Sequence, residues 1–194
     1  MGKSRLEAFS DGVIAIIITI MVLELKVAHD PSFDGLVKLA PVFLSYVLSF
    51  VYVAIYWNNH HHLLHLTHKV SGGILWANLH LLFWLSLVPF VTGWMGENHF
   101  AALPVALYGF VLLMAGVGFL ILQLAIVAAQ GENSPLAKAL GADIKGHASL
   151  TAYLIAIPCA FVSTWIAGAL YITVALMWLV PDKRFERAVR QLEK

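Results

Sequence analysis

The sequence is poor in charged residues and in cysteine. Only 12% of its 194 residues are Asp, Glu, Lys or Arg, whereas a soluble globular domain carries about 25%. So few charges cannot cover the surface of a soluble protein of this length. The 60% of hydrophobic residues and the mean hydropathy of +0.82 therefore indicate a membrane protein. The single cysteine, Cys159, excludes an intrachain disulfide.

The sequence also lacks the features of several functional classes. Its formal net charge of +1 provides no basic field for nucleic acid and no acidic field for cationic substrates. It contains no long linker, low-complexity tract or internal repeat. It contains no nucleophile elbow, no nucleotide-binding loop and no metal-ligand motif that includes a carboxylate. We therefore expect no enzyme activity, no cofactor, no bound metal and no nucleic-acid partner.

Long apolar runs recur along the chain. A transmembrane helix needs roughly 20 mostly apolar residues, and the candidate spans are Phe9–Val27, Leu39–Trp57, Val70–Met95, Leu103–Ala129 and the uncharged stretch Ala148–Val180. As one helix the last stretch would be about 50 Å long, against a hydrocarbon core of about 30 Å. It forms either one very oblique helix or two short helices that turn near Ser163–Thr164.

The distribution of lysine and arginine favours the two short helices. With six spans and both termini in the cytoplasm, ten basic residues lie inside and only Lys26 and Lys38 lie outside; five spans give five against seven. The sequence thus predicts an all-α polytopic membrane protein of the cell membrane. Residues 1–181 form its six-helix transmembrane domain, and residues 182–194 form a basic cytoplasmic tail.

The first apolar run contains the densest set of polar residues, and each costs free energy in a membrane unless it is paired or hydrated. These residues are Arg5, Glu7, Ser10, Asp11, Thr19 and Glu24. Because the acidic residues Glu7, Asp11 and Glu24 interrupt the apolar run, we expect a membrane helix here and not a cleavable signal peptide. Arg5 and Asp11 are six positions apart and lie on different faces, so both need partners on other helices. Asp11 also lies near the positive end of the helix dipole, which favours its charged form.

One stripe of this helix combines aliphatic residues with a threonine. Its members follow helical spacing: Ile16, Thr19, Ile20, Leu23 and Val27. Since every face of the run is apolar, the spacing alone favours a stripe that packs against a neighbouring helix. A membrane threonine usually donates its hydroxyl hydrogen to the preceding turn of its own helix.

The segment from Arg5 to Thr19 reads RLEAFSDGVIAIIIT. It resembles the Arg-x-x-x-Phe-Ser-Asp signature and the following helix of the endolysosomal potassium channels called transmembrane protein 175. The stretches 57–61 and 76–78 are similar to the second and third helices of that family. A single six-helix repeat resembles the prokaryotic branch, because animal members fuse two such repeats.

This resemblance implies a passive cation channel in which the first helices of a homotetramer line one central pore. The family has no Thr-Val-Gly-Tyr-Gly filter, and neither has this sequence. The family's hydrophobic constriction falls on Ile16, Ile20 and Leu23, and its threonine ring, which favours K⁺ modestly over Na⁺, falls on Thr19. K⁺ and other monovalent cations are then the permeant ions, and the lipid bilayer and other subunits are the partners.

The resemblance also gives the signature residues a structural role. Arg5, Phe9, Ser10 and Asp11 are expected to hold the pore helix to the second and third helices at its cytoplasmic end. We expect Asp11 and Ser10 to bond with residues among Trp57, His61 and Asn78, with His80 as a further possible partner. We expect Phe9 to fill the gap behind them.

Histidines suggest two alternatives. His80 lies within the third span, where an ionisable residue is a functional candidate; with Asp11 it would form the relay of a proton-permeable channel or a cation/proton transporter. A neutral histidine bonded to a neighbouring helix is the more ordinary interpretation of His80. Five further histidines cluster at His60, His61, His62, His65 and His68. Their spacing could bind zinc or sense pH, although a polar extension of the second helix is the more ordinary interpretation.

Overall fold

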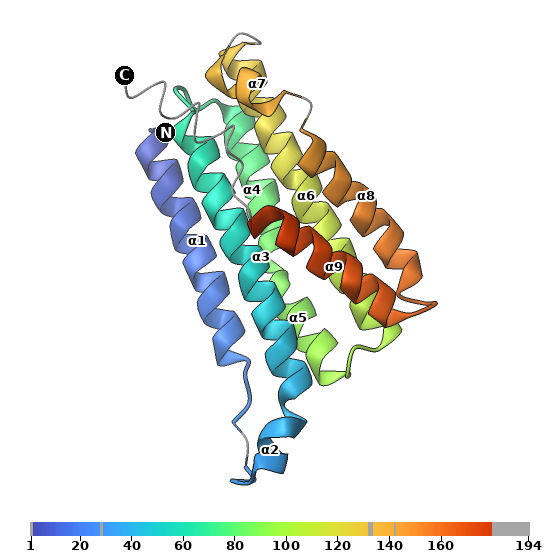
Figure 1. Ribbon diagram of the computed structural model, residues 1–194. Helices are drawn as coiled ribbons and strands as arrows, with labels where there is room; N and C mark the ends of the chain where they lie inside the picture. Colours follow the sequence, from blue (N-terminus) through green and yellow to red (C-terminus); the bar gives the residue numbers. More distant parts are fainter. Residues whose placement is uncertain (1, 28, 132–133, 142, 180–194) are drawn as a thin grey trace.

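The computed structural model describes residues 2–27, 29–131, 134–141 and 143–179, and within these ranges the regular structure is entirely α-helical (Figure 1). The helices are α1 (Lys3–Leu23), α2 (Phe33–Lys38), α3 (Ala40–His65), α4 (Gly72–Ser86), α5 (Val88–Glu97), α6 (Ala102–Gln130), α7 (Pro135–Leu140), α8 (Ile144–Cys159) and α9 (Thr164–Leu179). The all-α prediction is confirmed for the described residues. The predicted basic tail, residues 182–194, lies outside them.

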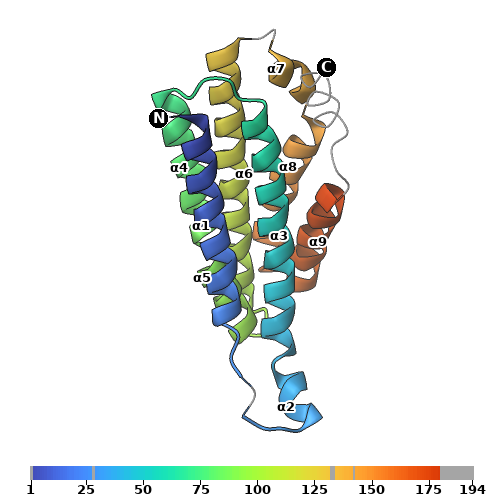
Figure 2. The ribbon, with the colours of Figure 1, turned by 90° about the vertical axis from the view of Figure 1, so that its left-hand side faces the viewer.

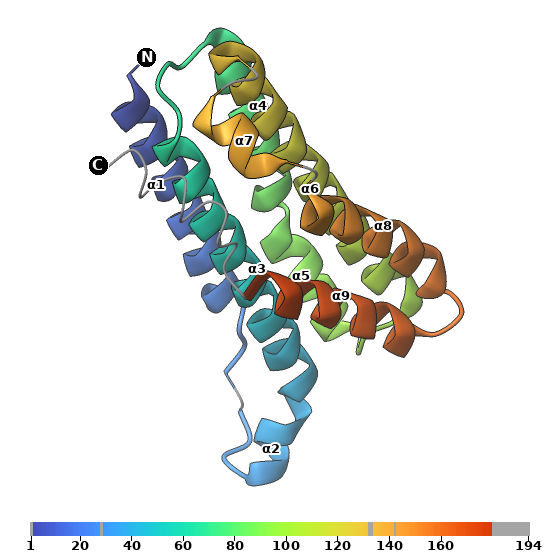
Figure 3. The same cartoon turned by 45° about the horizontal axis from the view of Figure 1, so that its top comes forward.

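The long helices run side by side along one axis. In Figures 1 and 2, α1, α3, α6 and the α4–α5 pair form an elongated bundle, with α2 at one end and α7 at the other. We call these the α2 end and the α7 end. Helix α8 packs against α6, and α9 crosses the bundle obliquely and contacts α3, α6 and α8 (Figure 3).

Four segments are long and apolar enough to cross a membrane: Lys3–Leu23, Ala40–His65, Gly72–Glu97 and Ala102–Gln130. Each overlaps one of the first four predicted spans. The third segment comprises α4 and α5, which meet at Leu87. Proline has no backbone N–H and its ring clashes with the preceding turn, so Pro89 explains the break.

The uncharged stretch near the end of the chain forms two helices and not one oblique helix. Helix α8 ends at Cys159 and α9 begins at Thr164, so the turn lies beside the predicted one. Each helix has 16 residues, which corresponds to about 24 Å and is shorter than the hydrocarbon core. Pro158 lies one residue before the end of α8.

Several polar groups inside the bundle pair with one another, as a lipid environment favours. Thr92 Oγ1 lies 2.6 Å from Ser49 Oγ, and Ser49 donates in turn to the hydroxyl of Tyr108 at 3.1 Å. Tyr52 donates to the carbonyl oxygen of Tyr171 at 2.6 Å. These bonds connect α3 with α5, α6 and α9, and they fix the scaffold against which α1 packs.

Candidate functional site

Helix α1 has two faces with different surroundings. Its buried face consists of Leu6, Ser10, Ile14, Ile17 and Met21, and it packs against α3, α4 and α5. The helix lies at the edge of the bundle (Figure 2). One side of α1 is therefore built into the protomer, while the other side faces outward.

The outward side carries the predicted pore stripe. Ile16 is 60% exposed, Ile20 42% and Leu23 76%, and Thr19 is also exposed. Among the described residues no other helix covers this stripe, so the packing against a neighbouring helix that the spacing alone favoured is not seen within the protomer. An apolar face of this kind contacts lipid or another subunit.

Thr19 bonds to its own helix, as membrane threonines usually do. Its Oγ1 donates to the carbonyl oxygen of Ala15 at 2.8 Å. Because this bond uses the hydroxyl hydrogen, the oxygen keeps its lone pairs available as acceptors. An exposed Thr19 can thus offer an oxygen ligand, but no further hydrogen, to a passing cation.

The signature residue Ser10 belongs to a buried chain of hydrogen bonds between three helices. Asn78 Nδ2 on α4 donates to Ser10 Oγ at 2.9 Å, and Ser10 Oγ donates to the carbonyl oxygen of Leu6 at 2.9 Å. The Oδ1 atom of Asn78 lies 2.7 Å from His60 Nε2 on α3. Ser10, His60 and Asn78 are all at most 1% exposed. The chain ties α1 to α3 and α4.

Asp11 forms the second tie, on the more exposed side of α1. Its Oδ1 accepts a hydrogen bond from Trp57 Nε1 on α3 at 3.0 Å. The Trp57 ring stacks on His61 with a centroid distance of 6.2 Å. Of the predicted partners, the structure thus brings Trp57 to Asp11 and Asn78 to Ser10. His61 stacks behind Trp57, and His60 is the histidine that joins the motif.

The sequence contained a signal for His60. His60 lies on the buried stripe of α3, with Ser49, Val53 and Leu64 at helical spacing. His61 is one position further and faces outward. The five histidines within nine residues resemble the solvated end of a helix. This pattern does not show that His60 lies on the buried face of α3.

Two signature residues are placed differently from expectation. Phe9 is 47% exposed, so within the protomer it does not fill a gap behind Asp11. Arg5 is exposed as well. Both lie on the side of α1 away from the buried Ser10, since residues four apart share a face but residues one or five apart do not.

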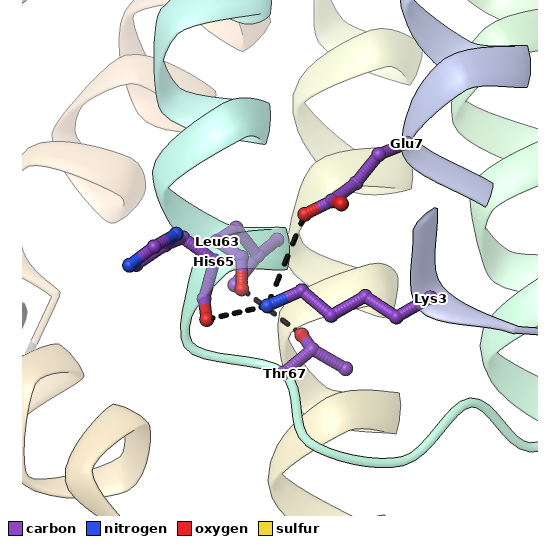
Figure 4. A network of polar contacts seen from close by, with 5 residues as sticks. All are labelled: Lys3, Glu7, Leu63, His65 and Thr67. Carbon is purple, nitrogen blue, oxygen red and sulfur yellow. Dashed lines mark hydrogen bonds and ion pairs between the residues drawn. The ribbon is translucent and has the colours of Figure 1, made fainter. Parts of the chain in front are cut away.

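Two lysine side chains hold α1 and the loop after it to the rest of the bundle, one at each end. At the α7 end, Lys3 Nζ donates to the carbonyl oxygen of His65 at 2.8 Å and lies 3.9 Å from Glu7 Oε1 (Figure 4). A cation at the C-terminus of α3 is favoured by the helix dipole. At the α2 end, Lys26 Nζ lies 2.6 Å from Glu97 Oε1, and hydrogen bonding to this carboxylate raises the pKa of Lys26.

His80 is not part of the motif. Its ring meets Trp84 edge-on at 6.2 Å, and Trp84 packs in turn against Phe110 of α6. His80 Nε2 and Trp84 Nε1 are buried and have no hydrogen-bond partner among the described residues. The expected bond from His80 to a neighbouring helix is absent there, and His80 shares no observed contact with Asp11. Across the described ranges, no group of three or more His, Cys, Asp or Glu side chains could hold a metal ion.

Known proteins resemble this chain in sequence and in structure. The sequence pattern of the family described as endosomal/lysosomal potassium channel TMEM175 matches residues 5–89. A potassium channel of a Chryseobacterium species is 53% identical over 191 residues, 98% of this chain and 100% of the relative. The endosomal/lysosomal proton channel TMEM175 of Danio rerio is 41% identical over 80 residues, 34% of this chain and 15% of that protein. The crystal structure of a lysosomal potassium-selective channel TMEM175 homolog from Chamaesiphon minutus matches with a TM-score of 0.81 and 26% identity, over 93% of this chain and 97% of that one.

Proposed function

Because the chain belongs to the family of the endosomal/lysosomal potassium channel TMEM175, we propose that it is a passive potassium-permeable channel whose α1 helices line a central pore. It is a channel protein and not an enzyme, and it needs no cofactor. The observation that carries the proposal is the outward stripe of Ile16, Ile20 and Leu23, exposed on a helix whose other face is held by three neighbours. One such helix cannot enclose a pore. The channel is therefore an oligomer, a homotetramer by analogy with the family.

In the proposed topology the chain crosses the cell membrane six times. The spans are α1, α3, the α4–α5 pair, α6, α8 and α9, and the α7 end of the bundle faces the cytoplasm. The excess of lysine and arginine on that side supports this orientation. The short α8 and α9 suit a peripheral position, where lipid can adapt to their length.

Three aliphatic layers on α1 form the proposed constriction. Side chains of Ile16, Ile20 and Leu23 from four subunits leave a narrow apolar neck, and an ion must lose water there without polar compensation. Such a neck closes by dewetting and conducts when the helices move apart enough to hydrate it.

Selectivity in this pore is assigned to Thr19. Four Thr19 oxygens, each with its hydroxyl hydrogen already donated to Ala15, would replace part of the hydration shell of a cation. K⁺ gives up its water more readily than Na⁺, so the ring favours K⁺. The preference is modest, since one ring replaces few waters.

The signature motif then holds the pore helix in place. The bonds of Ser10 and Asp11 to Asn78 and Trp57 keep the buried face of α1 on α3 and α4, so the opposite face stays directed at the axis. Substitutions in the motif should reduce assembly together with current, and should not change selectivity alone.

Recording in a planar bilayer under a potassium/sodium gradient tests the proposal. We expect unitary currents with a reversal potential shifted towards that of K⁺. Leu23→Ala should increase the open time or conductance, and Thr19→Ala should reduce the shift. Val22→Ala is the matched control, because Val22 is 45% exposed on the same helix but one position off the stripe. Equal effects of Val22→Ala and Leu23→Ala would contradict the assignment.

A proton-permeable channel or a cation/proton transporter remains the second candidate. The unpartnered, buried Nε2 of His80 and the name of the Danio rerio relative favour proton movement. A pH gradient at symmetric K⁺ distinguishes the candidates: a proton pathway through His80 gives a reversal potential that follows pH and that His80→Phe abolishes.

A further inference from the structure

A pocket separate from the α1 stripe lies between α3, α6 and α8. Its cavity volume is about 60 Å³, and it opens on one side. Trp178, near the end of α9, forms one wall. The pocket's lining residues Asp143, Gly146 and His147 lie at the start of α8, near the α7 end of the bundle.

The deep part of the pocket is apolar and aromatic. Its floor is formed by Tyr52, Tyr56, Phe119, Leu150 and Tyr153. The Tyr56 and Phe119 rings meet edge to face at 6.2 Å. The hydroxyl hydrogen of Tyr52 is donated elsewhere in the core. This floor suits a hydrocarbon chain, and its ring faces also attract a cation.

Oxygen acceptors from three helices line the part of the pocket nearer the α7 end. On α3, Asn59 Nδ2 donates to the carbonyl oxygen of Ile55 at 2.8 Å, so its Oδ1 remains an acceptor. At the start of α8, Asp143 Oδ1 accepts from the backbone N–H of Gly146 at 3.3 Å, and Oδ2 has no donor among the described residues. On α6, Gln123 is only 3% exposed and lines the pocket.

Gln123 is the strongest indication of a ligand. Its side chain has no hydrogen-bond partner among the described residues, although an unbonded amide inside a membrane protein costs free energy. Asp143 is the one acidic residue among the described residues that line the pocket, and none of them is lysine or arginine. The rim thus combines one carboxylate with two amide oxygens. A primary ammonium group, with three N–H donors, matches three such acceptors.

We propose that this pocket binds an amphiphile with a primary ammonium head, placed among Asn59, Gln123 and Asp143, and an apolar chain laid over the tyrosine and phenylalanine floor. Two sources supply this chemistry: an aminophospholipid of the adjoining leaflet and a free long-chain amine. The wall at Trp178 already carries one cation–π contact, because Lys145 Nζ lies 5.7 Å from its ring centroid. The proposal requires that the chain is embedded in a membrane, and does not depend on α1 lining the pore.

Tryptophan quenching by brominated ligands tests the proposal on the full chain. The protein is reconstituted in phosphatidylcholine bilayers with brominated phosphatidylethanolamine or brominated phosphatidylglycerol. The signal of Trp178 is obtained by comparison with Trp178→Phe. We expect the ethanolamine lipid to reach half-quenching at a mole fraction about tenfold lower than the glycerol lipid. A tenfold difference is the effect expected of one charge-assisted hydrogen bond. A brominated long-chain amine and the matching alcohol form the second arm. A preference confined to the amine identifies a free amine as the ligand, whereas a preference for the ethanolamine lipid identifies an aminophospholipid.

Two rim variants and one floor variant locate the site. Asp143→Asn keeps an N-cap acceptor for α8 but removes the charge, and Gln123→Leu removes the unbonded amide; each should remove the head-group preference. Gly116→Leu should reduce quenching by every ligand, because a Cβ at Gly116 points at Leu150 and Tyr56. Gly168→Leu on α9 is the control, since a Cβ there meets nothing within 4 Å.

The proposal is wrong if Trp178 is quenched equally by all four ligands, or if the preference survives both rim variants. Native mass spectrometry of the detergent-purified protein gives an independent measurement should Trp178→Phe not fold. The site is supported if the protein retains phosphatidylethanolamine or the long-chain amine and Asp143→Asn abolishes this retention. The proposal is overturned if all ligands are retained alike and Asp143→Asn changes nothing.

Discussion

Replacing Asn78 by leucine tests the buried hydrogen-bond chain that fixes α1. Leucine has the same branching at Cγ and a larger volume, so the substitution removes the two bonds of Asn78 without creating a cavity. Each neutral bond contributes about 1 kcal/mol, and a buried group left unpaired costs a further 1–3 kcal/mol. His60 Nε2, bonded at 2.7 Å to Asn78 Oδ1, becomes such a group. We therefore expect Asn78→Leu to lower the free energy of unfolding by about 3–5 kcal/mol.

A double-mutant cycle separates the orphaned histidine from the lost bonds. His60→Phe in the Asn78→Leu background removes the unpaired nitrogen, so the double variant should be less destabilised than the sum of the single variants by about 1–3 kcal/mol. The assay is unfolding by SDS in mixed micelles, with oligomer yield as the second readout. Asn98→Leu is the control, because among the observed contacts the Asn98 side chain, which directly follows α5, donates only to the carbonyl oxygen of Trp94. A loss below about 0.5 kcal/mol for Asn78→Leu, the range of ordinary surface substitutions, or strict additivity in the cycle, would refute the reasoning.

Three other substitutions probe contacts around the bundle. Trp57→Phe removes the donor to Asp11 and should reduce oligomer yield on size-exclusion chromatography less than Asn78→Leu does, because this bond is more exposed; an equal or larger loss would contradict that ranking. Lys26→Gln should lower thermal stability slightly and in a salt-dependent way. Glu97 raises the pKa of Lys26. The contribution of this ion pair to thermal stability should therefore be complete below the ordinary lysine pKa of 10.5 and should disappear only as pH rises beyond it. Loss of the stability difference between the native chain and Lys26→Gln near neutral pH would contradict this. Gly109→Ala should destabilise the protein, because its Cβ would overlap the Tyr171 hydroxyl, and Tyr171→Phe should restore part of the loss; no restoration would place the strain elsewhere.

The family and the helix positions followed from local sequence features. The RLEAFSD segment resembles one family, and the match of residues 5–89 confirms that identification. The first four helical segments followed from the length of their apolar runs. The break between α8 and α9 followed from the excessive length of the last run together with the distribution of lysine and arginine. These features depend on residues that are neighbours in the sequence and on the known thickness of the bilayer. Both can be used without knowing how the helices pack.

The partners of the motif depended on helix phase, which a membrane sequence conceals. When every face of a helix is apolar, the period of 3.6 residues leaves no mark. His61 was named among the possible partners and His60 was not, although the two differ by one residue of helix phase; it is His60 that bonds to Asn78. Lys3 and Lys26 were missed because basic residues near span ends also serve as topology signals. The pocket between α3, α6 and α8 could not be predicted, because it requires the packing of helices distant in sequence.

Cysteine accessibility tests most directly the claim that α1 lines the pore. Replacing the single native cysteine, Cys159→Ala, provides a background in which Leu23→Cys and the control Val22→Cys can be compared during bilayer recording. A water-soluble, positively charged thiol reagent should abolish the current of Leu23→Cys and leave that of Val22→Cys largely intact. If both variants respond equally, or if modified Leu23→Cys conducts as before, the pore does not run along the Ile16–Ile20–Leu23 stripe.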